Sequence, residues 1–202
     1  MGLFGKKKAA SEELAVWMDP YELSQMHAVL VAIAPRVGLE WGSGGSTKWM
    51  LEHIPSLQRY VSIEHDRAWY EKVRGKLSDD RLILEHVAPN VPSPGNTWKN
   101  KAEHQAIVDW RRGCEEDPSY MADYIGRPRQ LDVGPFDFIL VDGRARCPCM
   151  REGMELLRPG GVLVLHDGQR EEYRSTCESL GAVFIEPFAT GQIVIMRKPD
   201  AG

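Results

Sequence analysis

The chain has 202 residues, of which 43% are hydrophobic, and a formal net charge of −4. This composition excludes a disordered chain, and the length is sufficient for one domain with a sizeable core. The slightly acidic balance argues against a nucleic-acid-binding protein, because such proteins neutralise phosphates with basic side chains. No apolar run has the length of a membrane span or the pattern of a signal peptide, so we expect a cytoplasmic protein.

Residues 1–18 read as an N-terminal tail, and residues 19–202 as one domain with an insertion at about 88–134. The first helix begins at Asp19, a suitable N-cap, and ends before Pro35. Strands and helices then alternate, which predicts a parallel sheet with right-handed crossovers. We expect a strand from Val37, further strands at 60–64, 82–87, 136–141 and 162–166, helices at 47–54, 67–77, 101–112, 149–157 and 171–180, and a hairpin of 183–185 and 192–196.

A glycine-rich turn joins the first strand to the next helix, in the run Gly42-Ser43-Gly44-Gly45-Ser46. Glycines let the backbone adopt positive φ and let a ligand approach closely. The helix that follows would present free N–H groups and its positive end to that ligand. The pattern therefore predicts a site for a carboxylate, phosphate or sugar, although tight turns also use glycine for purely local reasons.

The second strand ends in acidic residues. Glu64 lies twenty positions after Gly44, the place where nucleotide-binding α/β folds carry an acid that accepts hydrogen bonds from ribose hydroxyls. Asp66 has a structural explanation, because it precedes a helical pattern and is a natural N-cap. We therefore expect Glu64 to be the ribose ligand.

The loop departs from the dinucleotide-binding fingerprint, since Thr47 stands where that fingerprint has its third glycine. The run Glu40-Trp41-Gly42-Ser43-Gly44-Gly45-Ser46-Thr47, followed by Ser62-Ile63-Glu64-His65-Asp66, instead resembles the class I S-adenosylmethionine-dependent methyltransferases. The segments 136–143 and 156–168 extend this resemblance. It implies a Rossmann-like three-layer α/β sandwich with a mostly parallel seven-stranded sheet and an antiparallel C-terminal strand. It also implies S-adenosylmethionine as the cofactor, bound by Glu40, Gly42, Ser43, Gly44, Ser46, Thr47, Glu64 and His65.

Asp142, His166 and Asp167 are the candidate catalytic residues, because they follow neighbouring strands beside the expected methyl donor. Asp142 or His166 could act as a general base, or Asp142 and Asp167 could share a Mg²⁺ ion. Arg144 and Gly168 weaken the metal interpretation, since metal-dependent relatives often carry further ligands there. The alternatives are a turn cap for Asp142 and a hydrogen-bonded strand histidine for His166.

Arg144 and Arg146 follow Asp142 directly. They could clamp an anionic acceptor, or they could balance the charges of Asp142 and Asp167. The insertion at 88–134 is too long for an ordinary connection, and we expect it to form a wall of the substrate site. A surface excursion with its own helix is the alternative.

The four cysteines lack the spacing of a zinc site, and we expect reduced thiols. Cys147 and Cys149 follow a strand end, so either could line the pocket. The function that these patterns favour is S-adenosylmethionine-dependent methyl transfer to a small-molecule acceptor, at a hydroxyl oxygen. The alternative is a non-catalytic nucleoside-binding protein on the same fold. A nicotinamide-dependent oxidoreductase is disfavoured by Thr47.

Overall fold

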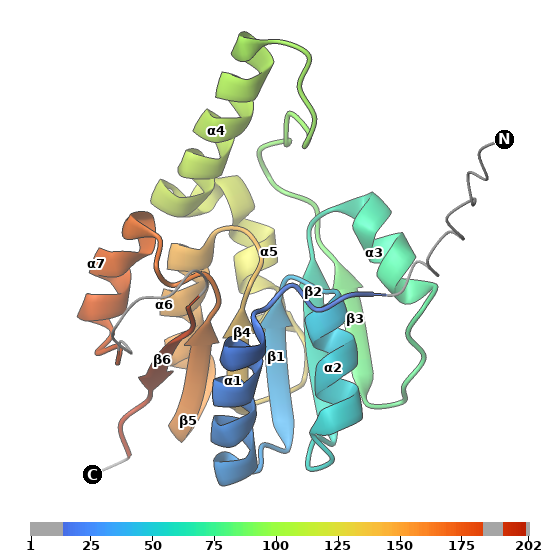
Figure 1. The fold of residues 1–202 in the computed structure, drawn as a ribbon, viewed down its shortest axis with the longest axis vertical. Coiled ribbons are helices and arrows are strands. Elements are labelled where there is room, and N and C mark those ends of the chain that lie inside the picture. Colours follow the sequence, from blue (N-terminus) through green and yellow to red (C-terminus); the bar gives the residue numbers. More distant parts are fainter. Residues whose placement is uncertain (1–13, 184–191, 201–202) are drawn as a thin grey trace, which may run out of the picture.

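The computed structural model describes residues 14–183 and 192–200. A six-stranded sheet of order β3-β2-β1-β4-β5-β6 runs through its centre (Figure 1). The strands are β1 (Val37–Trp41), β2 (Arg59–Glu64), β3 (Leu82–His86), β4 (Phe136–Val141), β5 (Leu157–Leu165) and β6 (Val194–Arg197). The first five strands pair in parallel, and β6 pairs antiparallel with β5.

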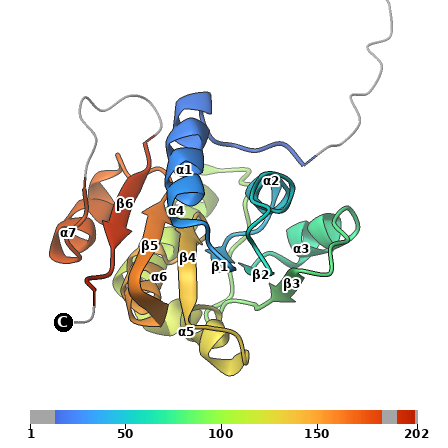
Figure 2. The same cartoon turned by 90° about the horizontal axis from the view of Figure 1, so that it is seen from below.

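Helices cover both faces of the sheet, as the parallel pairing requires. They are α1 (Pro20–Ile33), α2 (Gly45–His53), α3 (Arg67–Arg74), α4 (Lys101–Glu116), α5 (Ala122–Gly126), α6 (Arg146–Leu156) and α7 (Glu171–Ser179), with 3₁₀ turns η1 (Pro118–Met121) and η2 (Arg127–Gln130). Figure 2 shows α1 and α2 on one side of the sheet and α5 on the other. The three layers of the predicted sandwich are therefore present.

Residues of the central strands alternate between two apolar cores, which is the period of a β-strand. Leu39, Trp41 and Ile139 face the core that also holds buried side chains of α4, α5, α6 and α7. Phe138 and Leu140 face the second core, beneath α1 and α2. The central strands are therefore buried on both faces of the sheet.

The predicted elements that lie within the described residues occur in the expected order, and the insertion adds α5, η1 and η2, which were not predicted. Several bounds differ: α3 ends at Arg74 rather than 77, α4 ends at Glu116 rather than 112, and α6 and β5 begin earlier than expected. Helix α6 begins at Arg146 rather than Cys149, because Pro148 lies in the first helical turn, where its missing N–H costs no hydrogen bond. Strand β5 begins at Leu157 rather than Val162, since Leu157 already pairs with Phe136 before an irregularity in the register.

The number of strands differs from the expectation of seven. The residues that the structure describes form six, and the expected strand at 183–185 lies largely outside them. Its first residue, Val183, makes an isolated antiparallel bridge to Ile195. Residues 1–13 of the predicted tail also lie outside the described residues. The expectation of a tail is wrong for residues 14–18, because Leu14 and Met18 are buried and Ala15 packs against Gly45.

The insertion between β3 and β4 packs as a small helical unit. Helix α4 projects beyond the end of the sheet, as Figure 1 shows. The indole of Trp110 donates a hydrogen bond of 3.0 Å to the carbonyl oxygen of Val91, and Trp110 and Cys114 are buried in the first core. These contacts fix the base of α4 next to the carboxyl ends of the strands.

Candidate functional site

A cavity of about 820 Å³ opens at the carboxyl ends of β1, β2, β4 and β5. Six segments supply its walls: residues 15–18, the glycine loop, the start of α3 with the residues before it, the insertion through Asn96 and Arg111, the loop after β4 and the loop after β5. Most of the predicted site residues line it: Gly42, Ser43, Gly44, Ser46, Glu64, His65, Asp142, Arg144, Arg146, His166 and Asp167. Residues that are far apart in the sequence therefore meet in one place.

The glycine loop packs against neighbouring backbone too tightly for side chains. Gly42 has a φ of +99°, and a Cβ there would lie 2.6 Å from the backbone nitrogen of Gly143. A Cβ on Gly45 would lie 2.1 Å from the carbonyl oxygen of Ala15. The loop is thus held between the loop after β4 and the segment that precedes α1.

Glu40 lies beneath this loop and supports it. Its buried carboxylate accepts hydrogen bonds from the hydroxyls of Ser46, Thr47 (2.6 Å) and Ser62 (2.9 Å). Burial raises the pKa of Glu40 to about 7, against the opposing effect of these hydroxyls. Neither Glu40 nor Thr47 lines the cavity, so direct contact with the cofactor does not fit these two residues. They fix the shape of the loop instead.

The carboxylate of Glu64 is held at the cavity wall by backbone donors. It accepts from the N–H groups of Ser43 (3.1 Å), His65 (2.8 Å) and Asp66 (2.7 Å). The hydroxyl of Ser43 is a fourth and more distant donor, at 3.4 Å. A carboxylate offers about four acceptor positions, so a further donor from the cavity would take the place of this hydroxyl. The predicted N-cap is confirmed, because Asp66 accepts from the N–H of Trp69.

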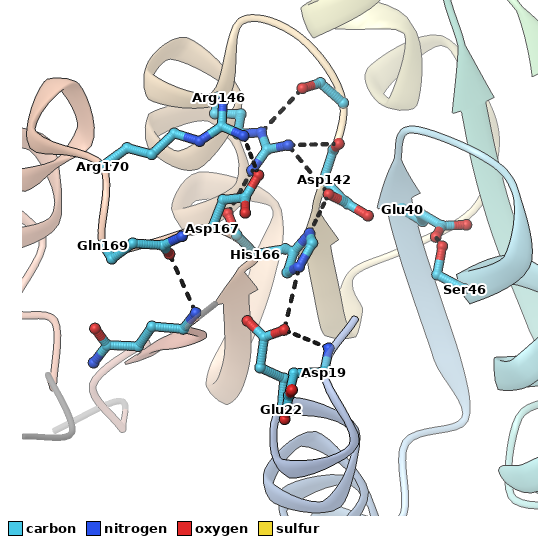
Figure 3. A network of polar contacts seen from close by, with 12 residues as sticks. Asp19, Glu22, Glu40, Ser46, Asp142, Arg146, His166, Asp167, Gln169 and Arg170 are labelled. Atoms are coloured by element: carbon cyan, nitrogen blue, oxygen red, sulfur yellow. Dashed lines mark hydrogen bonds and ion pairs between the residues drawn. The ribbon is translucent and has the colours of Figure 1, made fainter. Parts of the chain in front are cut away.

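His166 joins two carboxylates from different elements, as Figure 3 shows. Its Nδ1 lies 2.7 Å from Oδ1 of Asp142, and its Nε2 lies 3.4 Å from Oε2 of Glu22 on α1. Burial lowers the pKa of His166, but the hydrogen bonds to Asp142 and Glu22 more than offset this and raise it to about 9. An imidazolium with both nitrogens engaged cannot take up a proton. The expectation that His166 is a base is therefore a poor fit.

Arg146 lies between Asp142 and Asp167, with a side chain that is 5% exposed. Its guanidinium is 3.2 Å from Oδ1 of Asp142 and 3.4 Å from Oδ2 of Asp167, and it also donates to the carbonyl oxygens of Asp142 (3.0 Å) and Gly143 (3.0 Å). Of the two roles considered for Arg146, the balancing of the two aspartates is the one that its contacts show. The expected clamp on an acceptor does not fit this residue.

The expected Mg²⁺ ion does not fit this arrangement either. The guanidinium of Arg146 takes the position between the two carboxylates that the cation would have needed, and Asp167 is also paired with Arg170. Within the described ranges, no group of three or more histidine, cysteine, aspartate or glutamate side chains is placed to hold a metal ion. The guanidinium of Arg146 provides the positive charge between the two carboxylates instead.

Asp167 has a backbone φ of +58°, which is uncommon for a residue with a side chain. Such strain persists only where the surrounding structure imposes it. Here the carbonyl of His166 accepts from Arg146, and the side chain of Asp167 is held by Arg146 and Arg170. The loop after β5 is therefore fixed by the same two arginines.

The four cysteines are free and buried, and none of them lines the cavity. The expectation that Cys147 or Cys149 faces the pocket is wrong, because both begin α6 with their side chains turned into the first core. Burial raises the pKa of Cys147 to about 11.

Several residues that line the cavity, and Glu22 beside it, were not expected from the sequence. Glu22 carries the one advance signal, since Asp19 and Glu22 have the spacing of a capping box, which α1 indeed forms. The others come from elements whose packing the sequence does not reveal: Trp17, Trp69, Lys72 and Arg111. In residues 14–183 and 192–200, no helix combines the length and the apolar character needed to cross a membrane.

Three solved structures show what this fold is similar to. A methyltransferase-like protein from Silicibacter pomeroyi is 22% identical, and the match covers 94% of this chain and 92% of that chain with a TM-score of 0.57. An O-methyltransferase from Bacillus cereus, in complex with SAH, is 16% identical (90% and 82% covered, TM-score 0.62). The O-methyltransferase TomG from Streptomyces achromogenes, in complex with SAM, is 18% identical (93% and 82% covered, TM-score 0.57).

At these identities the likeness shows a shared fold. No family model matches the sequence, and a search of curated proteins finds no match.

Proposed function

We propose that this protein transfers the methyl group of S-adenosylmethionine to a hydroxyl oxygen of a small-molecule acceptor. The observation that carries the proposal is the position of Glu64, whose carboxylate is fixed by backbone donors and opens onto the same cavity as the glycine loop and Asp142. The fold agrees with it, because the similar solved structures include O-methyltransferases in complex with SAM and with SAH.

The glycine loop and Glu64 would hold the cofactor. Glu64 would accept hydrogen bonds from the ribose hydroxyls. The methionine carboxylate would lie at the loop and at the N-terminus of α2, where free N–H groups and the positive end of the helix favour an anion. Ser43, Ser46 and His65 complete this part of the wall. The bound cofactor supplies the methyl group as an activated sulfonium.

Asp142 would remove the proton from the acceptor. Its Oδ1 is held by His166 and Arg146, and in the described part of the chain no hydrogen bond reaches its Oδ2. Two cationic groups thus orient the carboxylate and leave one oxygen for the hydroxyl proton, which is the role of a general base. His166 and Asp167 are positioning residues in this scheme, Asp167 through its contacts with Arg146 and Arg170.

The proposal is tested by binding first and by turnover second. Isothermal titration calorimetry with S-adenosylhomocysteine and, separately, with NAD should give binding of the first alone. A screen of hydroxylated acceptors with S-adenosylmethionine labelled in its methyl group should then give a labelled product. Binding without any transfer would favour the nucleoside-binding protein, and the absence of S-adenosylhomocysteine binding would overturn the proposal.

A further inference from the structure

Two arginines of the cavity have no acidic partner. Among the residues that the structure describes, the side chains of Arg111 and Arg144 make no hydrogen bond and no ion pair, whereas the other two arginines of the cavity, Arg146 and Arg170, are both paired with carboxylates. Arg59 is a further unpaired arginine, but it is exposed and lies outside the cavity. Arg144 is therefore the one unpaired arginine of the described chain that is partly buried.

The position of Arg144 makes its lack of a partner costly. Burial lowers its pKa, and the like charges of Arg111 and Arg146 lower it further. Glu115 is the carboxylate whose charge acts on Arg144. It does not pair with Arg144, because it accepts a hydrogen bond from the N–H of Cys147 at 2.8 Å. A partly buried guanidinium without a partner is unfavourable unless a ligand supplies the missing anion.

Arg111 and Arg144 reach the cavity from two directions. Arg144 belongs to the loop after β4, two residues beyond the proposed base Asp142, and Arg111 is on α4 of the insertion. Guanidinium groups bind carboxylates, phosphates and sulfates through paired N–H donors. The cofactor's own carboxylate is expected at the glycine loop and α2, so it does not account for this pair.

We infer that the methyl acceptor carries an oxyanion, a carboxylate or a phosphate group, that is bound between Arg111 and Arg144. The inference rests on the proposed function and names the chemistry of its acceptor. The anion would place the acceptor hydroxyl beside Asp142, and α4 would take part in choosing the acceptor. The two arginines that would bind the anionic acceptor are thus Arg111 and Arg144, rather than Arg144 and Arg146 as expected from the sequence.

Binding of inorganic phosphate to the protein saturated with S-adenosylhomocysteine tests the inference. Calorimetry should show phosphate binding to the wild type and an affinity that is at least about tenfold lower in Arg144→Gln and in Arg111→Gln, because each loses a charge-assisted contact. Arg59→Gln is the matched control and should bind phosphate as the wild type does. All variants should bind S-adenosylhomocysteine within about twofold of the wild type.

Three results would overturn the inference. The first is no phosphate binding to the wild-type complex, and the second is equal phosphate binding by Arg111→Gln and the wild type. The third is a loss of S-adenosylhomocysteine binding in Arg144→Gln as large as its loss of phosphate binding, which would assign the arginine to the cofactor. Arg111 is exposed, so its variant keeps the test decisive if Arg144→Gln disturbs the packing. If the wild type does not bind S-adenosylhomocysteine, the proposed function is contradicted instead. Phosphate binding to the free protein would then test the anion site by itself.

Discussion

The imidazole of His166 and the carboxylate of Glu22 connect β5 to α1, with Nε2 and Oε2 3.4 Å apart in a region where both side chains are buried. The same oxygen of Glu22 accepts from the N–H of Asp19 at 2.8 Å, while its Oε1 is buried without a hydrogen-bond partner in the described residues. The first helix therefore contributes a buried carboxylate next to His166, in addition to the apolar face that it packs on the sheet.

Glu22→Gln should lower the pKa of His166 below its value of about 9, because one of the two carboxylates that favour the imidazolium is removed. An NMR titration of the His166 ring measures this directly. Glu178→Gln, which changes an exposed acid on α7, is the control and should leave the titration unchanged. A His166 pKa that is the same in Glu22→Gln and the wild type would show that the contact has no electrostatic effect.

The free energy of unfolding should fall as the pH rises from about 6.5 to about 9. A histidine whose pKa is higher in the folded than in the unfolded state stabilises the fold below its unfolded pKa, and this stabilisation is lost as the pH rises through the folded value. For a shift from 6.5 to about 9 the loss is at most about 3 kcal/mol.

Urea unfolding of the wild type and of His166→Gln checks this prediction. Glu40, whose pKa is about 7, titrates in both proteins, so its contribution cancels in the difference between them over pH 7 to 9. The difference in stability between the two proteins should shrink toward pH 9. A constant difference over this range would mean that His166 is neutral in the folded protein.

Gly42→Ala should abolish binding of S-adenosylhomocysteine while the far-ultraviolet circular dichroism stays that of a folded protein. The new Cβ would lie 2.6 Å from the backbone nitrogen of Gly143, and the φ of +99° is strained for alanine. Gly95→Ala is the control, since Gly95 has a similar φ of +101° and open space around it. Normal binding by Gly42→Ala would place the ligand elsewhere.

Glu64→Ala should weaken S-adenosylhomocysteine binding by about 1–3 kcal/mol, because two ribose hydroxyls would lose their acceptor. Calorimetry gives the affinity, and thermal unfolding separates it from the loss of the backbone contacts that Glu64 also makes. Asp66→Ala provides the comparison, since it removes the N-cap of α3 but keeps Glu64. An unchanged affinity in Glu64→Ala would remove this residue from the cofactor site.

Asp142→Asn should keep the cofactor affinity and lower turnover by about 100-fold or more, the usual scale for a lost general base. Turnover of the wild type should be the same in EDTA as in Mg²⁺, because Arg146 already bridges Asp142 and Asp167. A labelled-methyl assay with the acceptor found by screening measures both. Wild-type turnover by Asp142→Asn would return Asp142 to the role of a turn residue.

Much of the fold could be predicted from the sequence because its signals are local. Pro20 after a capping residue, the glycine turn after Val37 and the apolar run 136–141 each determine the structure of their own segment. The start of α6 was missed because Pro148 reads as a boundary in sequence, although a proline is also compatible with a first helical turn.

The candidate site was predictable where residues follow strand ends, and less so where it depends on packing. Glu64 and Asp142 were placed correctly at the cavity, since parallel strands end at one edge of a sheet. The partners of Arg146 were left open, because the sequence does not give the distance from its guanidinium to Asp167. The charge of Glu22 and the approach of Arg111 depend on how α1 and α4 dock, and no local pattern encodes that.

The strand order has a consequence for how this protein can diversify. Because β3 lies at the sheet edge and β4 lies beyond β2 and β1, the chain must travel past two strands before it re-enters the sheet. The insertion makes this connection between β3 and β4 and adds no strand of its own. Under the proposed function, changes in the length and surface of the insertion would alter the acceptor side of the cavity, where Arg111 lies, without changing the six strands of the sheet.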